Sequence, residues 1–207
     1  MSTKILTIVI VGEGSSDSAL EWPIRWLLKS LGIERPLEIY NSFRSQDTNS
    51  GLEGKLKTAC QIFEPDLVLL HRDSDGTTYE KRLQEIQDVS RIVDSVAVVP
   101  LITVRMMEAW LLISESAIRN ASGNPQGRKP LALPKIRSLE GIADPKSLLF
   151  QLLREASELK GRRLKKFSET EARKITAVEI EDFSPLLRLR AFQALKEALK
   201  DQLLSTN

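Results

Sequence analysis

The stretch Asp66–Gly76, DLVLLHRDSDG, decides how the rest of the chain is interpreted. Its apolar run, expected as a strand over Asp66–Leu70, ends at a polar corner that carries two carboxylates, Asp73 and Asp75. Buried strands of parallel sheets are continuous apolar runs, and ligands bind just past their carboxyl ends. Two neighbouring carboxylates at such an end predict a bound divalent cation such as Mg²⁺, because like charges a few Å apart raise each other's pKa. The alternative is a solvated Asp-Ser-Asp-Gly turn, since these residues favour turns.

Three more apolar runs of strand length alternate with helical patterns around this stretch. Strands are expected at Ile5–Val11, Leu37–Phe43 and Val96–Ile102. Helices are expected over residues 15–31, Gly51–Phe63, Tyr79–Ser90, Met106–Asn120, Pro145–Gly161, Ser168–Ile175 and Pro185–Leu204, with loops at Arg44–Ser50 and Ala121–Pro134. This alternation predicts an α/β fold with a central, mostly parallel four-stranded sheet flanked by helices. We expect a catalytic domain over residues 1–120 and a basic, helical C-terminal extension over 121–207 packed on it.

Composition places the chain among ordinary globular proteins. It has 207 residues, of which 42% are apolar and 28% charged, enough for one domain with its own core. The single cysteine, Cys60, excludes an internal disulfide and a cysteine-based zinc site within one chain. The run Ile5–Val11 is too short to span a membrane, and no signal-peptide pattern surrounds it. We expect a cytoplasmic protein without membrane association.

The net charge of +2 hides an asymmetry between the two parts of the chain. Residues 1–116 carry 12 Lys and Arg against 17 Asp and Glu, and residues 117–207 carry 18 against 11. An acidic part beside a basic part suits a cation-binding centre that faces a polyanion held by the other part. The alternative is that the charged helices are simply solvated.

Acidic residues follow three of the four expected strands. Glu13 follows the first, Asp73 and Asp75 follow the third, and Glu108 comes shortly after the fourth. Since the carboxyl ends of parallel strands share one edge, we expect these carboxylates to converge there. Such a cluster suits phosphoryl or phosphodiester transfer with Mg²⁺ or Mn²⁺. Glu13 could serve as a metal ligand or as a general acid/base. The structural alternatives are that Glu13 is simply a loop residue and that Glu108 is an acid favoured at the start of a helix.

Three motifs together resemble a Toprim domain. They are IVIVGEGSSDSAL, LVLLHRDSDG and VRMMEAWLLIS, and the later stretches DPKSLLFQLLREA and FSPLLRLRAFQAL extend the likeness over most of the chain. More specifically, the chain resembles a Toprim-like bacterial family related to the nuclease domains of OLD-type proteins. The resemblance implies a Rossmann-like Toprim sheet and a role in phage defence or mobile-element biology.

The resemblance also implies roles for particular residues. Glu13 would serve in acid/base or metal chemistry, and Asp73 and Asp75 would hold Mg²⁺. Asp17 and Glu108 match further acidic positions of the metal site, and Lys146, in the DPK stretch, is a candidate cation for a phosphate or for the transition state. A first-turn helix acid is the alternative for Asp17, and a solvated lysine is the alternative for Lys146.

Basic residues supply candidate contacts to a nucleic acid. Arg72 and Arg105 flank the predicted site and suit bidentate contact with phosphate oxygens, or pairing with the carboxylates beside them. The densest basic run consists of Lys160, Arg162, Arg163, Lys165 and Lys166, and it suits salt-sensitive contact with a phosphate backbone. His71, the only histidine, is expected to complete a local hydrogen bond, and the alternatives are that it binds a phosphate or relays protons.

These observations predict a metal-dependent nuclease that hydrolyses phosphodiester bonds, with DNA a better candidate than RNA. No GxxxxGK[ST] loop is present, so a required ATPase would be a separate subunit. A homo-oligomer is also open, because the tryptophans suit either core or interface. One alternative is a Toprim scaffold that binds nucleic acid or a partner without chemistry. Another is a phosphatase of the haloacid-dehalogenase type, because the stretch DSDGT resembles the DxDGT motif of those enzymes.

Overall fold

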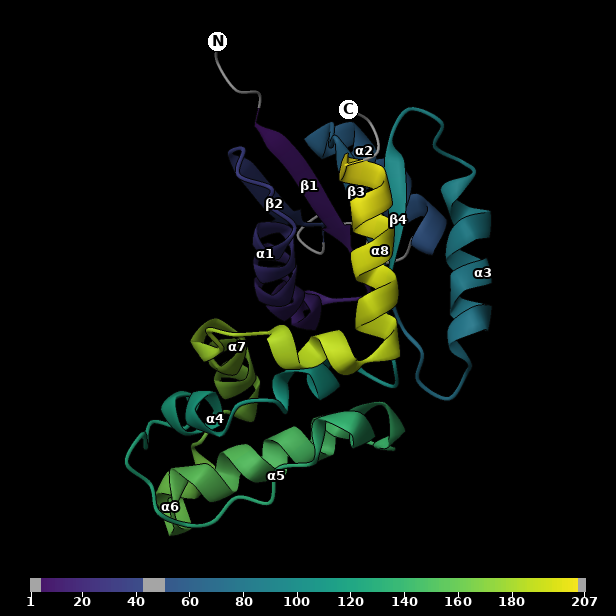
Figure 1. The fold of residues 1–207 in the computed structure, drawn as a ribbon. Coiled ribbons are helices and arrows are strands. Elements are labelled where there is room, and N and C mark those ends of the chain that lie inside the picture. The colour runs from purple at the N-terminus through teal and green to yellow at the C-terminus, as the bar shows by residue number, and fades with distance from the viewer. Residues whose placement is uncertain (1–4, 43–50, 205–207) are drawn as a thin grey trace.

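A four-stranded, all-parallel sheet forms the centre of the molecule in the computed structural model, which describes residues 5–42 and 51–204 (Figure 1). Its strands lie in the order β2-β1-β3-β4. They are β1 (Leu6–Val11), β2 (Leu37–Asn41), β3 (Leu67–Asp73) and β4 (Ala97–Thr103). The predicted α/β, Rossmann-like class is confirmed. The predicted end of the second strand at Phe43 and the loop Arg44–Ser50 lie outside the described residues.

Helices cover both faces of the sheet because strand side chains alternate between the faces. One face carries Ile8, Ile10 and Leu69, which pack in a cluster with α1 (Glu21–Ser30) and α8 (Arg190–Leu204). The other face carries a second cluster that includes residues of α2 (Leu52–Phe63) and α3 (Tyr79–Ser90). Figure 1 shows α8 lying along β4, which it contacts.

The rest of the chain is helical, as expected. It contains η3 (Met107–Leu111), α4 (Glu115–Ala121), η4 (Ile136–Gly141), α5 (Pro145–Ser157), α6 (Gly161–Lys165), α7 (Glu169–Glu179) and η5 (Ser184–Arg188), where η denotes a 3-10 helix. One apolar cluster runs from the sheet through η3 into α5, α7 and α8, with Trp110 edge-on to Phe192 at 5.0 Å between ring centroids. The division of the chain at residue 120 stays a prediction. Within the described residues no helix is long and apolar enough to cross a membrane.

Several predicted helices begin or end elsewhere for local reasons. The segment 15–31 starts as a 3-10 helix, η1 (Ser15–Leu20), so Pro23 falls in the first turn of α1, where its missing N–H costs nothing. The predicted helix Met106–Asn120 is divided, because the Ser114 side chain accepts the N–H of Ala117 and starts α4. The helix predicted to reach Gly161 ends at Ser157, before Glu158 in a left-handed conformation.

The third strand is longer than predicted, and this extension shapes the site. β3 continues past Leu70, and Asp73 is in register with Thr103 of β4. The prediction ended the strand at Leu70 because the next residues are polar, and it was wrong by three residues. In a strand, alternate side chains share a face, so His71 and Asp73 lie on the same face of the sheet.

Candidate active site

The candidate site lies where the carboxyl ends of β1 and β3 meet. These strands are adjacent at the centre of the sheet, and the chain runs from β1 to β2 on one side and onward to β3 on the other. In open α/β sheets, ligands bind outside the carboxyl ends at such a reversal of strand order. Glu13 follows β1 directly, and Asp73 is the last residue of β3. The strand order therefore places these two predicted residues beside each other.

The loop that carries Glu13 is closed by a buried aspartate. Asp17 Oδ2 accepts the N–H groups of Glu13 (2.7 Å) and Gly14 (3.3 Å). Burial opposes ionisation of Asp17, but hydrogen bonds from His71 and from these two amides outweigh it and lower the pKa of the carboxyl. A Cβ at position 12 would lie 2.1 Å from Asp17 Oδ2, so only glycine allows this close approach. Asp17 therefore holds the loop, and its predicted role as a metal ligand stays a prediction.

A lysine that the sequence pattern does not single out holds the same loop from outside. Lys55 Nζ, on α2, donates to the carbonyl oxygens of Gly12 (3.2 Å) and Glu13 (3.0 Å). Asp17 thus accepts hydrogen bonds from amide N–H groups of the loop, and Lys55 donates hydrogen bonds to its carbonyl oxygens. The backbone that presents Glu13 is fixed on both sides.

His71 joins the two strand ends. It is fully buried, with Nδ1 3.2 Å from Asp17 Oδ2 and Nε2 3.4 Å from Asp73 Oδ1. Burial alone would lower the pKa of the imidazole, but hydrogen bonds and charge from the two aspartates raise it to about 9. The protonated ring is therefore a cation between two carboxylates. Thr103 Oγ1 also donates to Asp73 Oδ1, which leaves the second oxygen of Asp73 for other partners.

The sequence contained a signal for this arrangement. If β3 is extended to Asp73, the strand period alone places His71 beside that carboxylate. If the strand is ended at Leu70, the sequence pattern does not show that His71 and Asp73 lie on the same face. The contact with Asp17, 54 residues earlier in the chain, has no local signal.

Glu13 is partly buried and coupled to its neighbours. Its Oε1 lies 2.5 Å from Arg72 Nη1, and Arg72 Nε lies 3.2 Å from Glu85 of α3. Burial raises the pKa of the Glu13 carboxyl, the Arg72 guanidinium opposes this, and the nearby Asp73 carboxylate adds to it. The Glu13 side chain keeps 38% of its surface exposed. A carboxyl group with a raised pKa that still reaches water suits general acid/base chemistry.

The DSDG turn is held by its own backbone and by arginines. Asp75 and Arg105 both adopt left-handed conformations (φ 45° and 66°), and the Asp75 N–H donates to the Arg105 carbonyl at 2.9 Å. Arg105 donates its N–H to Ser74 Oγ (2.7 Å) and a guanidinium N–H to the Asp75 carbonyl (3.2 Å). Arg82 Nε donates to the Asp73 carbonyl at 3.0 Å. The turn is therefore anchored at both aspartates, and in the described part of the chain no hydrogen bond or ion pair engages the Asp75 carboxylate.

Glu108 has a structural partner that the sequence did not reveal. Its side chain is almost completely buried, and Oε1 accepts from Arg173 Nη1 of α7 at 2.8 Å. The pair joins η3 to α7. The assignment of Glu108 as a metal ligand stays a prediction, and a metal at this carboxylate would have to compete with the buried arginine.

The remaining predicted residues lie on the helical part of the chain. Lys146 is exposed at the start of α5, with Nζ 6.0 Å from the centroid of the Phe150 ring. The five basic residues of the run 160–166 are exposed on and around α6, which lies at the end of the helical region away from the sheet (Figure 1). No contact in the described structure joins these side chains to the carboxylates of the strand ends. Their roles stay predictions.

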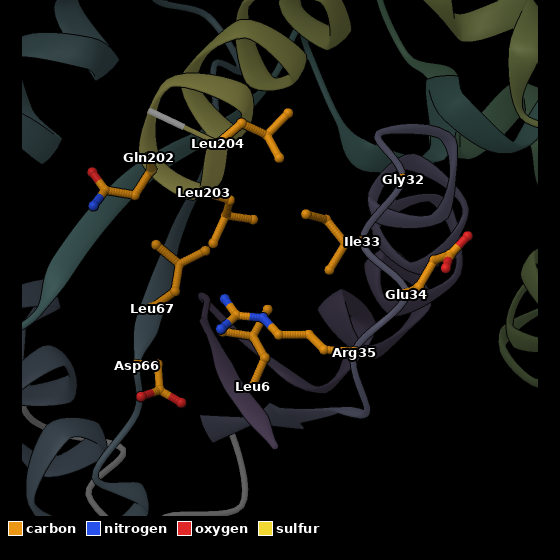
Figure 2. Close-up of a pocket in the computed structure, with 10 residues that line it drawn as sticks. All are labelled: Leu6, Gly32, Ile33, Glu34, Arg35, Asp66, Leu67, Gln202, Leu203 and Leu204. Atoms are coloured by element: carbon orange, nitrogen blue, oxygen red, sulfur yellow. The ribbon is translucent and has the colours of Figure 1, made fainter. Parts of the chain in front are cut away.

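Two cavities lie at opposite edges of the sheet. One of about 460 Å³ borders the DSDG turn and is lined in part by Ser74, Gly76 and Arg105. A larger one of about 570 Å³ lies at the amino ends of β1 and β3, where Figure 2 shows Arg35 reaching toward Leu6 and Leu67. Since ligands of open α/β sheets bind at the carboxyl edge, we place the candidate site at the carboxylates of that edge. The smaller cavity adjoins them through Ser74, although Glu13, Asp73 and Asp75 are not among its lining residues.

The carboxylates offer ligands for a metal without forming a complete cage. In residues 5–42 and 51–204, no group of three or more His, Cys, Asp or Glu side chains is arranged to hold an ion. Mg²⁺ does not require one, because it keeps several waters and binds through one or two carboxylates together with substrate phosphates. The second oxygen of Asp73, which no hydrogen bond or ion pair of the described residues engages, fits that requirement.

No protein-family model, curated protein or solved structure matches this chain. The resemblance to Toprim domains therefore stays a prediction, and the function is inferred from the geometry of the site.

Proposed function

We propose that the chain is a metal-dependent phosphodiesterase that cleaves nucleic acid, DNA more readily than RNA. The observation that carries this proposal is the meeting of Glu13 and Asp73 at the central strand ends, with guanidinium groups beside them. Asp73, with Asp75 beside it in the turn, would hold Mg²⁺ or Mn²⁺ together with waters and the substrate phosphate, which leaves Glu13 for acid/base chemistry. When bound, the metal supplies positive charge to the phosphate and lowers the pKa of a water molecule.

The protein's own groups divide the remaining work. Glu13, with its raised pKa and partial exposure, accepts a proton from the attacking water. Arg72 and Arg105 carry charge that suits phosphate oxygens, which guanidinium groups contact bidentately. His71 does not reach the solvent, so it orients Asp73 and Asp17 and does not transfer protons to the substrate.

The test compares cleavage of supercoiled DNA, linear DNA and RNA, with Mg²⁺ or Mn²⁺, by the wild type and two variants. Glu13→Gln and Asp73→Asn keep the size of each side chain and remove its charge. We expect Glu13→Gln to lower the rate by about 10²-fold or more, the usual contribution of a general base. Asp73→Asn should lower the rate by removing a charged ligand of the metal. Asp88→Asn, an exposed carboxylate of α3 paired with Arg91, is the matched control and should leave the rate unchanged.

The same experiment separates the alternatives. DNA binding without cleavage under either metal would contradict hydrolysis and support a non-catalytic scaffold. Hydrolysis of a small phosphate monoester that depends on Asp73 but not on Glu13 would support a phosphatase of the haloacid-dehalogenase type. Equal cleavage by wild type and both variants would show that the activity comes from elsewhere.

A further inference from the structure

The cavity beside the DSDG turn is formed by segments that are far apart in the chain. Its walls come from the turn itself, the start of α3, the residues after β4, η4 and the start of α8. Ser74, next to Asp73, lines one side, and Arg190 of α8 lines another. A molecule in this cavity therefore contacts the turn that carries Asp73 and Asp75, through Ser74 and Gly76, and contacts α8 as well.

The cavity offers flat surfaces of the kind on which bases stack. Tyr79 lines it, and the guanidinium carbon of Arg190 lies 5.9 Å from the centroid of the Tyr79 ring. Arg190 is largely exposed, and it donates to Glu80 at 3.0 Å. An exposed ion pair of this kind contributes only about 0–1 kcal/mol, so an entering ligand can move the guanidinium at little cost. Single-stranded nucleic acids are bound by stacking on aromatic rings and on arginine planes.

The polar groups of the cavity suit a sugar-phosphate unit. The two acids that line it are engaged: Glu80 by Arg190, and Glu140 by the N–H groups of Arg190 (3.3 Å) and Ala191 (2.9 Å). Arg105 uses one guanidinium nitrogen on the Asp75 carbonyl, and its other two have no partner in the described part of the chain. Arg105 is therefore the cation that stays available to a phosphate.

We propose that this cavity binds the nucleotide adjacent to the phosphate that is cleaved, with its base against Tyr79 and Arg190 and its phosphate toward Arg105. This inference rests on the proposed function and adds a substrate class to it. A base that must enter a cavity to stack has to be free of its complementary strand. The preferred substrate is accordingly single-stranded or an unpaired end.

The test measures binding of a short thymidine oligonucleotide by calorimetry in chelator, where no cleavage occurs. We expect Tyr79→Ala to weaken binding by about fivefold or more, which is the lower end for the loss of one stacked base. Tyr79→Phe keeps the ring and should restore the affinity. Arg190→Ala should also weaken binding, whereas Arg91→Ala, an equally exposed arginine in an ion pair on α3, should not.

The outcomes separate this inference from the proposed function. Unchanged affinity in both Tyr79→Ala and Arg190→Ala overturns the cavity as a nucleotide site, even if the wild type cleaves DNA. Binding that depends on Tyr79 and Arg190, without cleavage under any metal, overturns the hydrolase and leaves the nucleotide site in place. Because Arg190 is exposed, its variant should fold normally and keeps the test decisive if Tyr79→Ala is unstable.

Discussion

Two buried clusters of opposite charges, similar in composition, differ in what they leave exposed. At the sheet edge, His71 lies between Asp17 and Asp73, and the Asp73 side chain keeps 17% of its surface exposed. Between η3 and α7, Glu108 and Arg173 pair with only 4% and 6% of their side chains exposed. The first cluster orients a carboxylate that still reaches water, and the second uses its charges to join two helices. Burial of an acid beside a cation is thus no sign of a functional site unless an oxygen remains accessible.

The largest effect on stability should come from breaking the buried ion pair between Glu108 and Arg173. Glu108→Ala leaves the Arg173 cation buried without a partner, and we expect the free energy of unfolding to fall by about 3–5 kcal/mol. Arg173→Ala should cost less than Glu108→Ala, because Arg173 Nε is already buried without a hydrogen bond in the described structure. Urea denaturation measures both values.

A double variant provides the control for this prediction. Glu108→Leu with Arg173→Met replaces both charges by apolar groups and should recover most of the lost stability. If Glu108→Ala costs less than about 1 kcal/mol, the value of an exposed pair, then the pair does not hold η3 to α7 in the way its burial implies.

For the cluster at the sheet edge, the comparable test of stability is the substitution Gly12→Ala. The added methyl group would lie 2.1 Å from Asp17 Oδ2, so Asp17 must move away from the amides it holds and from His71. We expect a loss of about 1–3 kcal/mol in stability, as for other steric insertions into packed sites, together with reduced cleavage. Gly14→Ala is the control, because a Cβ there meets no atom within 4 Å and its φ of −166° suits any residue. Equal effects of the two substitutions would contradict the close contact at Gly12.

The charge on His71 can be measured directly, because it is the only histidine. In metal-free protein, its ring signals in an NMR titration should show a pKa of about 9, well above the usual 6.5. Asp17→Asn should lower that value, since it removes one of the two carboxylates that raise it.

The sign of the stability effect is set by this raised pKa. The protonated ring is favoured in the folded state, so its contribution to stability is complete below about pH 6.5 and is lost as the pH rises through about 9. A His71 titration midpoint near 6.5 in the wild type would show that the two aspartates do not hold the ring as described.

The smallest effect should come from exposed charges far from the sheet edge. Arg162 and Arg163 of α6 are exposed. Replacing both arginines by Gln should make the dependence of DNA binding on salt less steep. The slope of log K against log salt should shrink in magnitude by at most about 1.8, because each phosphate of duplex DNA that is no longer neutralised accounts for about 0.9. Lys200→Gln in α8 is the control and should leave the slope unchanged. A slope that is the same in wild type and variant would remove α6 from the nucleic-acid interface.

Sequence reasoning could predict what depends on local pattern. The apolar runs located all four strands, and the helix Tyr79–Ser90 has the bounds that its pattern predicts. The parallel sheet then placed Glu13 and Asp73 at one edge, because strand ends share that edge in every such fold.

What sequence reasoning could not predict depends on partners distant in the chain. Glu108 and Arg173 are 65 residues apart, and Lys55 reaches the Glu13 carbonyl across 42. No helical or strand period relates such positions. The carboxylate pattern that predicts a metal ligand at Glu108 therefore could not predict its buried ion pair with Arg173.

The position of α8 in the chain has a consequence for folding. This helix packs on β4, yet the whole helical region from η3 to η5 separates the two in sequence. While the chain is being made, the sheet can pair its strands long before residues 190–204 arrive to cover that face. Contacts so distant in sequence slow folding and leave apolar surface exposed in the meantime. A half-made chain thus carries an open sheet face until α8 covers it.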